Sequence, residues 1–99
     1  MRKYLKRARG ETCKVCIPGI CNMNPDTVVA AHSNKGRHGK GMGKKAHDWY
    51  VAHACSDCHD AIDGRTHTHL SPLEREELWQ RGFERTLDWG FQNGYIVFV

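Results

Sequence analysis

The sequence predicts a single α+β domain that is held together by metal rather than by disulfide bonds. Two short segments with strand character, 27–31 and 48–52, are followed by a short helical segment and by a longer one that starts at Ser71. The cysteines fall into two groups, one before the first strand and one after the second. A chain of 99 residues buries only a modest core and usually needs a staple, which two groups of thiols can provide through a shared metal ion.

The distribution of charge indicates a polyanionic partner. The chain carries 15 Lys and Arg against 11 Asp and Glu, which gives a formal net charge of +4. Five Lys or Arg fall in residues 2–9 and five more, with His38, in residues 35–45, and neither run contains an acid. Basic runs also keep small proteins soluble, but two of them together favour nucleic acid as the partner.

Cysteine usage and hydropathy predict a cytoplasmic protein without a membrane span. The five cysteines are odd in number, and the chain opens on a charged run rather than on an apolar signal segment. We expect residues 1–10 to form a short, exposed basic element in a reducing compartment, where clustered thiols bind zinc more often than they pair. No apolar run approaches the roughly 20 residues that a membrane helix requires.

The thiols predict a structural zinc site with four sulfur ligands. Cys13, Cys16 and Cys21 flank a Pro-Gly turn, which can bring two of the three thiols together. With Cys55 and Cys58, two of them would complete a tetrahedral site. Spacing alone favours Cys13 with Cys16 as the first pair.

Three other interpretations of the thiols compete with zinc. A redox Cys-x-x-Cys would require a thioredoxin-like βαβ context, which the sequence lacks. His59 directly after Cys58 also matches a c-type haem attachment motif, but that chemistry normally requires export. Inert buried cysteines rarely cluster in this way.

A long glycine-rich loop separates the two strands. Residues 33–47 hold four glycines interleaved with cations and show no apolar pattern, so backbone N–H groups lie beside positive charge, as phosphate binding requires. The loop lacks the Walker A order, and a merely flexible linker is the alternative interpretation. The predicted phosphate contacts are Arg37, Lys40, Lys44 and Lys45.

The segment after the second thiol pair carries side chains for another metal ion. His59 and Asp63 are four residues apart and share one face of a helix. His67 could join them only if the helix continues past Gly64. We therefore predict a divalent ion on this helix, which would stabilise developing charge on a substrate.

His32, at the end of the first strand, has the position of a general base. A neutral imidazole can take a proton from water near pH 7, and the resulting hydroxide can attack phosphorus. Asp48 is the one acid between Asp26 and Asp57, which makes it a candidate for orienting this base or for binding metal. The remaining histidines are expected to be loop or surface residues: His38, His47, His53 and His69.

The C-terminal third carries the strongest helix signal in the chain. Ser71, Pro72 and Glu74 form a capping box with proline at the first helical position, and Gly94 predicts the end after about Asn93. An apolar stripe with a four-residue repeat is expected to pack onto the metal-bearing half. Its members are Trp79, Phe83, Leu87 and Phe91. Residues 95–99 are expected to form an edge strand or an association surface.

Four stretches of the sequence resemble one family. They are Cys-x-x-x-Ile-Pro-Gly-Ile-Cys-Asn at 13–22, Ala-His at 31–32, Gly-Met-Gly-Lys-Lys-Ala at 41–46 and Ala-Cys-Ser-Asp-Cys-His-Asp-Ala-Ile-Asp at 54–63. Together they are similar to the YbcO family of small phage and prophage nucleases, which is related to the RecA-dependent nuclease Ref. The order strand, histidine, loop, strand and metal helix also resembles the ββα-metal (HNH) nuclease finger.

The resemblance implies a choice of ligands that spacing does not make. It favours Cys13, Cys21, Cys55 and Cys58 as the zinc ligands and leaves Cys16 as a spare thiol. It further implies that His32 is the general base, that His59 is the helix ligand of the catalytic ion, and that Asp63 is a second ligand. Ala31 departs from the pattern, because many HNH enzymes place a metal ligand immediately before the base. The catalytic metal would then either lack one ligand or take it from Asp48 or His67.

The resulting prediction is a metal-dependent DNA endonuclease in which zinc is structural and Mg²⁺ or another divalent ion is catalytic. The expected organisation is a basic segment at 1–10, a nuclease core at 11–67, a helix at 71–93 and an apolar tail at 95–99. The expected partners are DNA and a host recombinase. A zinc-stapled nucleic-acid-binding module without catalysis is the first alternative. A protein-interaction domain that uses the apolar tail is the second.

Overall fold

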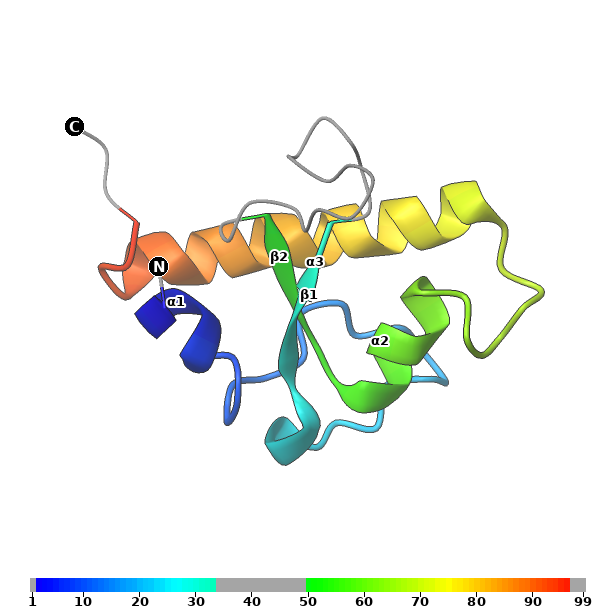
Figure 1. Cartoon of the computed structure of the whole chain (residues 1–99), viewed down its shortest axis with the longest axis horizontal. Coiled ribbons are helices and arrows are strands. Elements are labelled where there is room, and N and C mark those ends of the chain that lie inside the picture. Colours follow the sequence, from blue (N-terminus) through cyan, green and yellow to red (C-terminus); the bar gives the residue numbers. More distant parts are fainter. Residues whose placement is uncertain (1, 34–49, 97–99) are drawn as a thin grey trace.

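The computed structural model describes residues 2–33 and 50–96 of the chain. The elements, in order, are α1 (Arg2–Lys6), the short 3₁₀ helix η1 (Pro25–Thr27), β1 (Val29–His32), β2 (Val51–Ala54), α2 (Ser56–Ile62) and α3 (Pro72–Gln92). The two strands form an antiparallel pair between α1 and α2, and α3 runs across the whole molecule beside them (Figure 1). The predicted α+β fold with a long C-terminal helix is confirmed.

Both strands begin two to three residues later than the sequence suggests. The first starts at Val29 because Asn24 caps η1 instead, accepting a hydrogen bond from the Asp26 N–H at 3.0 Å. The second starts at Val51, and its register pairs Val29 with Ala54. Residues 48 and 49 of the predicted second strand lie outside the described residues. All four β2 residues are buried, as expected for a strand covered on both faces.

Helix α3 begins as predicted, with a complete capping box. The Glu74 N–H donates to Ser71 Oγ at 3.1 Å, and Glu74 Oε1 accepts from the Ser71 N–H at 2.8 Å. The helix ends at Gln92, and Gly94 follows with a φ of +75°. No helix in the described part of the chain is both long and apolar enough to span a bilayer.

The buried face of α3 differs in part from the predicted stripe. Trp79 and Phe83 are buried and stacked, with ring centroids 5.0 Å apart, but Phe91 is 36% exposed. Gly82 and Gly90 lie on the buried face instead, where a Cβ would approach Val15 Cγ2 to 2.6 Å and Ile96 Cδ1 to 2.8 Å respectively. The helix therefore comes close enough to its neighbours that small residues, invisible to an apolar periodicity, line its contact surface.

The N-terminal segment is not the fully exposed element that we expected. Tyr4 and Ala8 are each 2% exposed. The Tyr4 ring lies 5.8 Å from the ring of Trp89 and 6.4 Å from that of Tyr95, at the C-terminal end of α3. The charged side chains of Lys6, Arg7 and Arg9 remain exposed, so α1 is an amphipathic turn that covers one end of the core.

Residues 95 and 96 do not form the predicted edge strand. The N–H groups of Tyr95 and Ile96 both donate to the Gly90 carbonyl, at 2.9 and 3.2 Å, and the Tyr95 ring stacks on Trp89. These residues fold back to close the end of α3. Residues 97–99 lie outside the described residues.

Candidate metal centre

Four cysteine sulfurs gather at the N-terminal end of α2. Cys13, Cys21, Cys55 and Cys58 each offer a sulfur, and all four sulfurs lie within 4.8 Å of one another. They come from the segment before η1, from the residue that caps α2 and from its first turn. In the ranges 2–33 and 50–96 this is the one group of three or more His, Cys, Asp or Glu side chains with ligand atoms so close.

The spacing of the sulfurs suits a tetrahedral zinc ion. The Sγ atoms of Cys21 and Cys55 are 3.8 Å apart. A tetrahedron with Zn–S bonds of about 2.3 Å has edges of about 3.8 Å. Cys55 and Cys58 are fully buried, and Cys13 and Cys21 are partly buried, so the group has the closed character of a structural site. The four cysteines could therefore hold a metal such as zinc.

Backbone N–H groups surround these sulfurs. Cys13 Sγ accepts from the N–H groups of Cys16 and Cys55, both at 3.2 Å. Cys58 Sγ accepts from the Ile17 N–H at 3.4 Å, and Cys55 Sγ accepts from the Cys58 N–H at 3.4 Å. Donors of this kind stabilise thiolate charge and orient the ligands of a metal.

The thiols of the group titrate very differently from one another. The hydrogen bond from Cys58, helped by the backbone donors, lowers the pKa of Cys13 to about 5. Burial raises the pKa of Cys21 to about 12, and the hydrogen bond to Cys13 together with burial raises the pKa of Cys58. The protein alone thus favours the thiolate form of Cys13 and disfavours that of Cys21 and Cys58, so these two thiols need a bound cation to lose their protons.

Cys16 stands apart from the four sulfurs although its spacing from Cys13 is the more familiar one. Its side chain is exposed, and its φ is +44°, a left-handed conformation that turns the chain between Cys13 and Ile17. The backbone N–H of Cys16 contributes to the site through its bond to Cys13 Sγ, but its thiol does not belong to the group. The preference that spacing gave to Cys16 over Cys21 is wrong.

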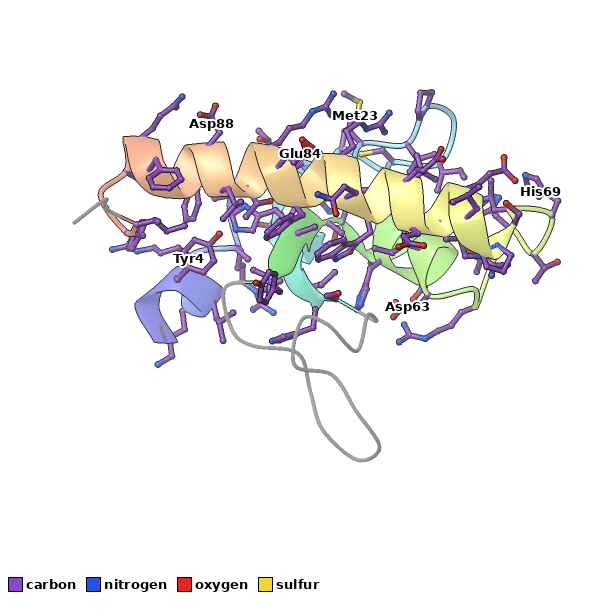
Figure 2. All side chains as sticks on the ribbon, turned by 90° about the horizontal axis from the view of Figure 1, so that it is seen from above. Tyr4, Met23, Asp63, His69, Glu84 and Asp88 are labelled. Carbon is purple, nitrogen blue, oxygen red and sulfur yellow. The ribbon has the colours of Figure 1, made fainter. Side chains whose placement is uncertain are left out.

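The other end of α2 carries a histidine–carboxylate pair. His59 Nε2 lies 3.1 Å from Asp63 Oδ2, and both side chains are about one quarter exposed. Arg65 donates to the same Asp63 oxygen at 3.0 Å and to Asp60 Oδ1 at 2.8 Å. In Figure 2, Asp63 lies on the same side of α3 as Tyr4, whereas Met23, beside the sulfur group, lies on the opposite side.

The helix ends before it can bring His67 to this pair. Helix α2 stops at Ile62, Asp63 is its C-cap, and Gly64 has a φ of +78°. His67 is exposed, has a φ of +50°, and its ring lies 5.9 Å from that of His69. His67 could share a helical face with His59 only if the helix continued past Gly64. The helix ends before Gly64, so His67 does not share this face.

His32 is the last residue of β1, where it pairs with Val51, and its side chain is partly buried. Ala31, which precedes it, is 1% exposed and points into the core, and its carbonyl accepts from Trp79 Nε1 at 3.0 Å. Successive strand residues face opposite sides, so this packing turns His32 away from the core. The other predicted site residues lie outside the described residues: Asp48, Arg37, Lys40, Lys44 and Lys45.

His53 was expected on the surface and is instead fully buried in β2. Its ring meets that of Trp89 edge to face at 4.6 Å, and its backbone N–H donates to Thr86 Oγ1 at 2.9 Å. Within the described residues neither ring nitrogen has a hydrogen-bond partner, and burial lowers the pKa of His53 to about 4. The second strand was predicted at 48–52, which left His53 outside it. The observed strand at 51–54 includes His53, and this difference explains the wrong prediction.

Comparison with known proteins gives one consistent family. The profile of the family described as "Putative nuclease YbcO" matches residues 2–95. Two relatives with that name, from Escherichia coli strain K12 and from Enterobacteria phage 82, are each 52% identical over 67 residues, which is 68% of this chain and 69% of theirs. A solved structure of "a putative bacteriophage protein" from E. coli K-12 MG1655 is 40% identical, with a TM-score of 0.75, and the match covers 92% of this chain and 99% of that one.

Proposed function

This chain belongs to the YbcO family, and from that membership we propose that it is a metal-dependent HNH-type endonuclease that hydrolyses DNA phosphodiester bonds. One observation carries the proposal beyond the family's name. The β1–β2 pair leads directly into α2, so that His32 ends the first strand while His59 and Asp63 lie on the helix that follows the second. This is the order of parts in a ββα-metal finger.

In this proposal, Cys13, Cys21, Cys55 and Cys58 hold a structural zinc ion. The ion would join the segment before η1 to the junction of β2 and α2, which residues 22–54 otherwise separate along the chain. A helix of seven residues is too short to be stable alone, so this tie also fixes the direction of α2 and of the side chains on it. The role of zinc here is structural, and the chemistry is assigned to the other end of the helix.

His32 is proposed as the general base. Its imidazole would accept a proton from the water that attacks phosphorus. The packing of Ala31 into the core and the hydrogen bond from Trp79 to its carbonyl fix the strand at this point, which helps to orient His32. Asp48 is proposed to orient this base or to add a ligand.

His59 and Asp63 are proposed to bind the catalytic divalent ion. Their contact atoms are 3.1 Å apart, and neighbouring ligands around an octahedral ion with bonds of about 2.1 Å are separated by about 3.0 Å. When bound, such an ion supplies charge stabilisation for the phosphate and the leaving oxygen. Arg65 must release Asp63 for this purpose, and a ligand role for His67 would require the turn after α2 to fold back.

DNA is the proposed substrate, with a host recombinase as a possible partner. Arg37, Lys40, Lys44 and Lys45 are proposed to contact backbone phosphates. Affinity should then fall steeply with salt and show weak sequence preference. A cytoplasmic location and an origin in phage or prophage complete the proposal, in keeping with the relative from phage 82.

Nicking of supercoiled plasmid in Mg²⁺ or Mn²⁺ tests the proposal. The wild type should nick, and His32→Ala should not, because the base is removed. His69→Ala is the matched control: His69 is exposed and outside the proposed site, and this variant should nick like the wild type. Cleavage that survives His32→Ala would remove His32 as the base.

A second candidate is a zinc-stapled nucleic-acid-binding module without catalysis. It is favoured by the engagement of Asp63 with Arg65 and by the packing of Ala31, which offers no metal ligand. Under this alternative, neither the wild type nor His32→Ala would nick the plasmid, while both would bind DNA.

A further inference from the structure

Arg81 of helix α3 contacts the turn that follows Cys13 of the four-sulfur group. Its Nη2 donates to the carbonyl oxygens of Val15 at 2.6 Å and of Cys16 at 3.2 Å. These residues form the turn between the ligand Cys13 and the Pro-Gly pair. The guanidinium is partly buried, and the turn is pressed against the same helix at Gly82, where a Cβ would lie 3.1 Å from Val15 Cα.

The two carbonyls belong to two of the peptide groups whose N–H groups donate to the four sulfurs. The Val15 carbonyl shares its peptide group with the Cys16 N–H, which donates to Cys13 Sγ at 3.2 Å. The Cys16 carbonyl shares its peptide group with the Ile17 N–H, which donates to Cys58 Sγ at 3.4 Å. Two series of hydrogen bonds therefore connect Arg81 with two sulfurs, and each runs from the guanidinium through one peptide group to one sulfur atom.

We propose that Arg81 is a positioning residue for the four-sulfur site, and that it strengthens zinc binding by polarising these two peptide groups. A carbonyl that accepts a hydrogen bond from a cation makes the N–H of the same peptide group a stronger donor, and bonds in such chains reinforce one another. Stronger N–H donors in turn stabilise thiolate ligands. This inference rests on the proposed zinc site and adds to it a link from α3.

Arg85 provides a matched control on the same helix. Its Nη1 donates to the Lys14 carbonyl at 3.2 Å, one residue before the carbonyls that Arg81 holds. The N–H of that peptide group belongs to Val15 and donates to the His53 carbonyl at 3.2 Å. This series of hydrogen bonds therefore ends at β2 and not at a sulfur. Loss of Arg85 removes a similar anchor of the same turn without touching a sulfur.

The first experiment measures zinc affinity by competition with a chromophoric chelator for the wild type, Arg81→Met, Arg81→Lys and Arg85→Met. Outer-shell substitutions at metal sites typically cost about 10- to 100-fold in affinity, and we expect this loss for Arg81→Met. Arg81→Lys, which keeps the charge, should recover part of it. The zinc affinity of Arg85→Met should stay within about threefold of that of the wild type, since the peptide group that Arg85 binds donates no hydrogen bond to a sulfur.

A spectrum of the cobalt-substituted protein separates polarisation from simple anchoring. Weaker N–H···S bonds raise the energy of the sulfur lone pairs, so the sulfur-to-cobalt charge-transfer band of Arg81→Met should move to lower energy. The band of Arg85→Met should stay in place. An equal loss of zinc affinity in both Met variants, or an unmoved band in Arg81→Met, would overturn the inference. A wild type that retains no zinc would instead overturn the zinc site itself.

Discussion

The two ends of α2 differ in burial and in the chemistry of their side chains, which fits a structural role for one end and the proposed activity for the other. At its N-terminal end, four sulfurs from two buried and two partly buried cysteines lie together and accept hydrogen bonds from backbone N–H groups. At its C-terminal end, His59, Asp63 and the more exposed Arg65 form a partly exposed cluster of side chains that bind one another. A site that stabilises a fold is best built complete, whereas a site that acts on a large substrate must stay open and let its groups exchange partners. In the proposed function one short helix would serve both purposes, because its two ends face different sides of the molecule.

Loss of the zinc ion proposed at the four sulfurs should have the largest effect. Cys58→Ser should unfold the protein, because structural zinc contributes about 10–16 kcal/mol in small domains and total stability is only about 5–15 kcal/mol. Circular dichroism and bound zinc check this together. Cys16→Ser, which leaves the sulfur group intact, should keep both the fold and the metal. A Cys58→Ser protein with the melting temperature of the wild type would show that the four-sulfur group does not stabilise the fold.

The support of β1 next to His32 comes next. Trp79→Ala should lower the free energy of unfolding by about 3–5 kcal/mol, since it removes a buried ring stacked on Phe83. It also removes the donor to the Ala31 carbonyl, so nicking should fall more than the folded fraction does. Urea unfolding and plasmid nicking measure the two effects. Phe91→Ala, at the exposed end of the predicted stripe, should cost far less.

The core around β2 should be sensitive to acid through His53. Burial lowers the pKa of His53 from its usual 6.5 to about 4, so protonation favours the unfolded chain. The stabilising contribution is complete above pH 6.5 and is lost as the pH falls towards 4. Between pH 7 and pH 5 the wild type should lose about 2 kcal/mol more than His53→Gln, with metal loss cancelling in the difference. Parallel curves of stability against pH for the two proteins would contradict this.

The smallest effect on stability is expected at His59, which is proposed to bind the catalytic ion. His59→Ala should change the free energy of unfolding by less than about 0.5–1 kcal/mol, because partly exposed ion pairs contribute little. Nicking should nevertheless be lost. Urea unfolding and the plasmid assay, with His69→Ala as the control, compare the two outcomes. An unfolded His59→Ala protein would show that the open end is structural after all.

Local signals in the sequence predicted local structure well. The capping box at Ser71 and Glu74 specifies a helix start through neighbours only three residues apart, and the structure has it. The α+β class likewise follows from the order of strand and helix patterns. The strand limits were less accurate, because Asn24 diverts the chain into η1 before β1 can begin.

The features that the sequence did not reveal depend on distant contacts. Tyr4 is buried because Trp89 and Tyr95 converge on it from the far end of the chain. His53 is buried because Thr86 and Trp89 cover β2, and Gly82 matters because Val15 approaches α3 there. None of these neighbours is close in sequence. At the sulfur group, spacing favoured Cys16, and only the path of the turn at Val15 and Cys16 directs that thiol outward.

The split of the sulfurs between residues 13 and 21 and residues 55 and 58 also sets an order of events during synthesis. A nascent chain on the ribosome presents two sulfurs early and must wait for Cys58 to emerge before it can hold an ion with all four. Cys55 caps α2 with the same sulfur that would bind the ion, so metal capture and the start of that helix become one event. In cells short of zinc, completed chains would then accumulate in which α2 has not formed, and proteases would degrade them.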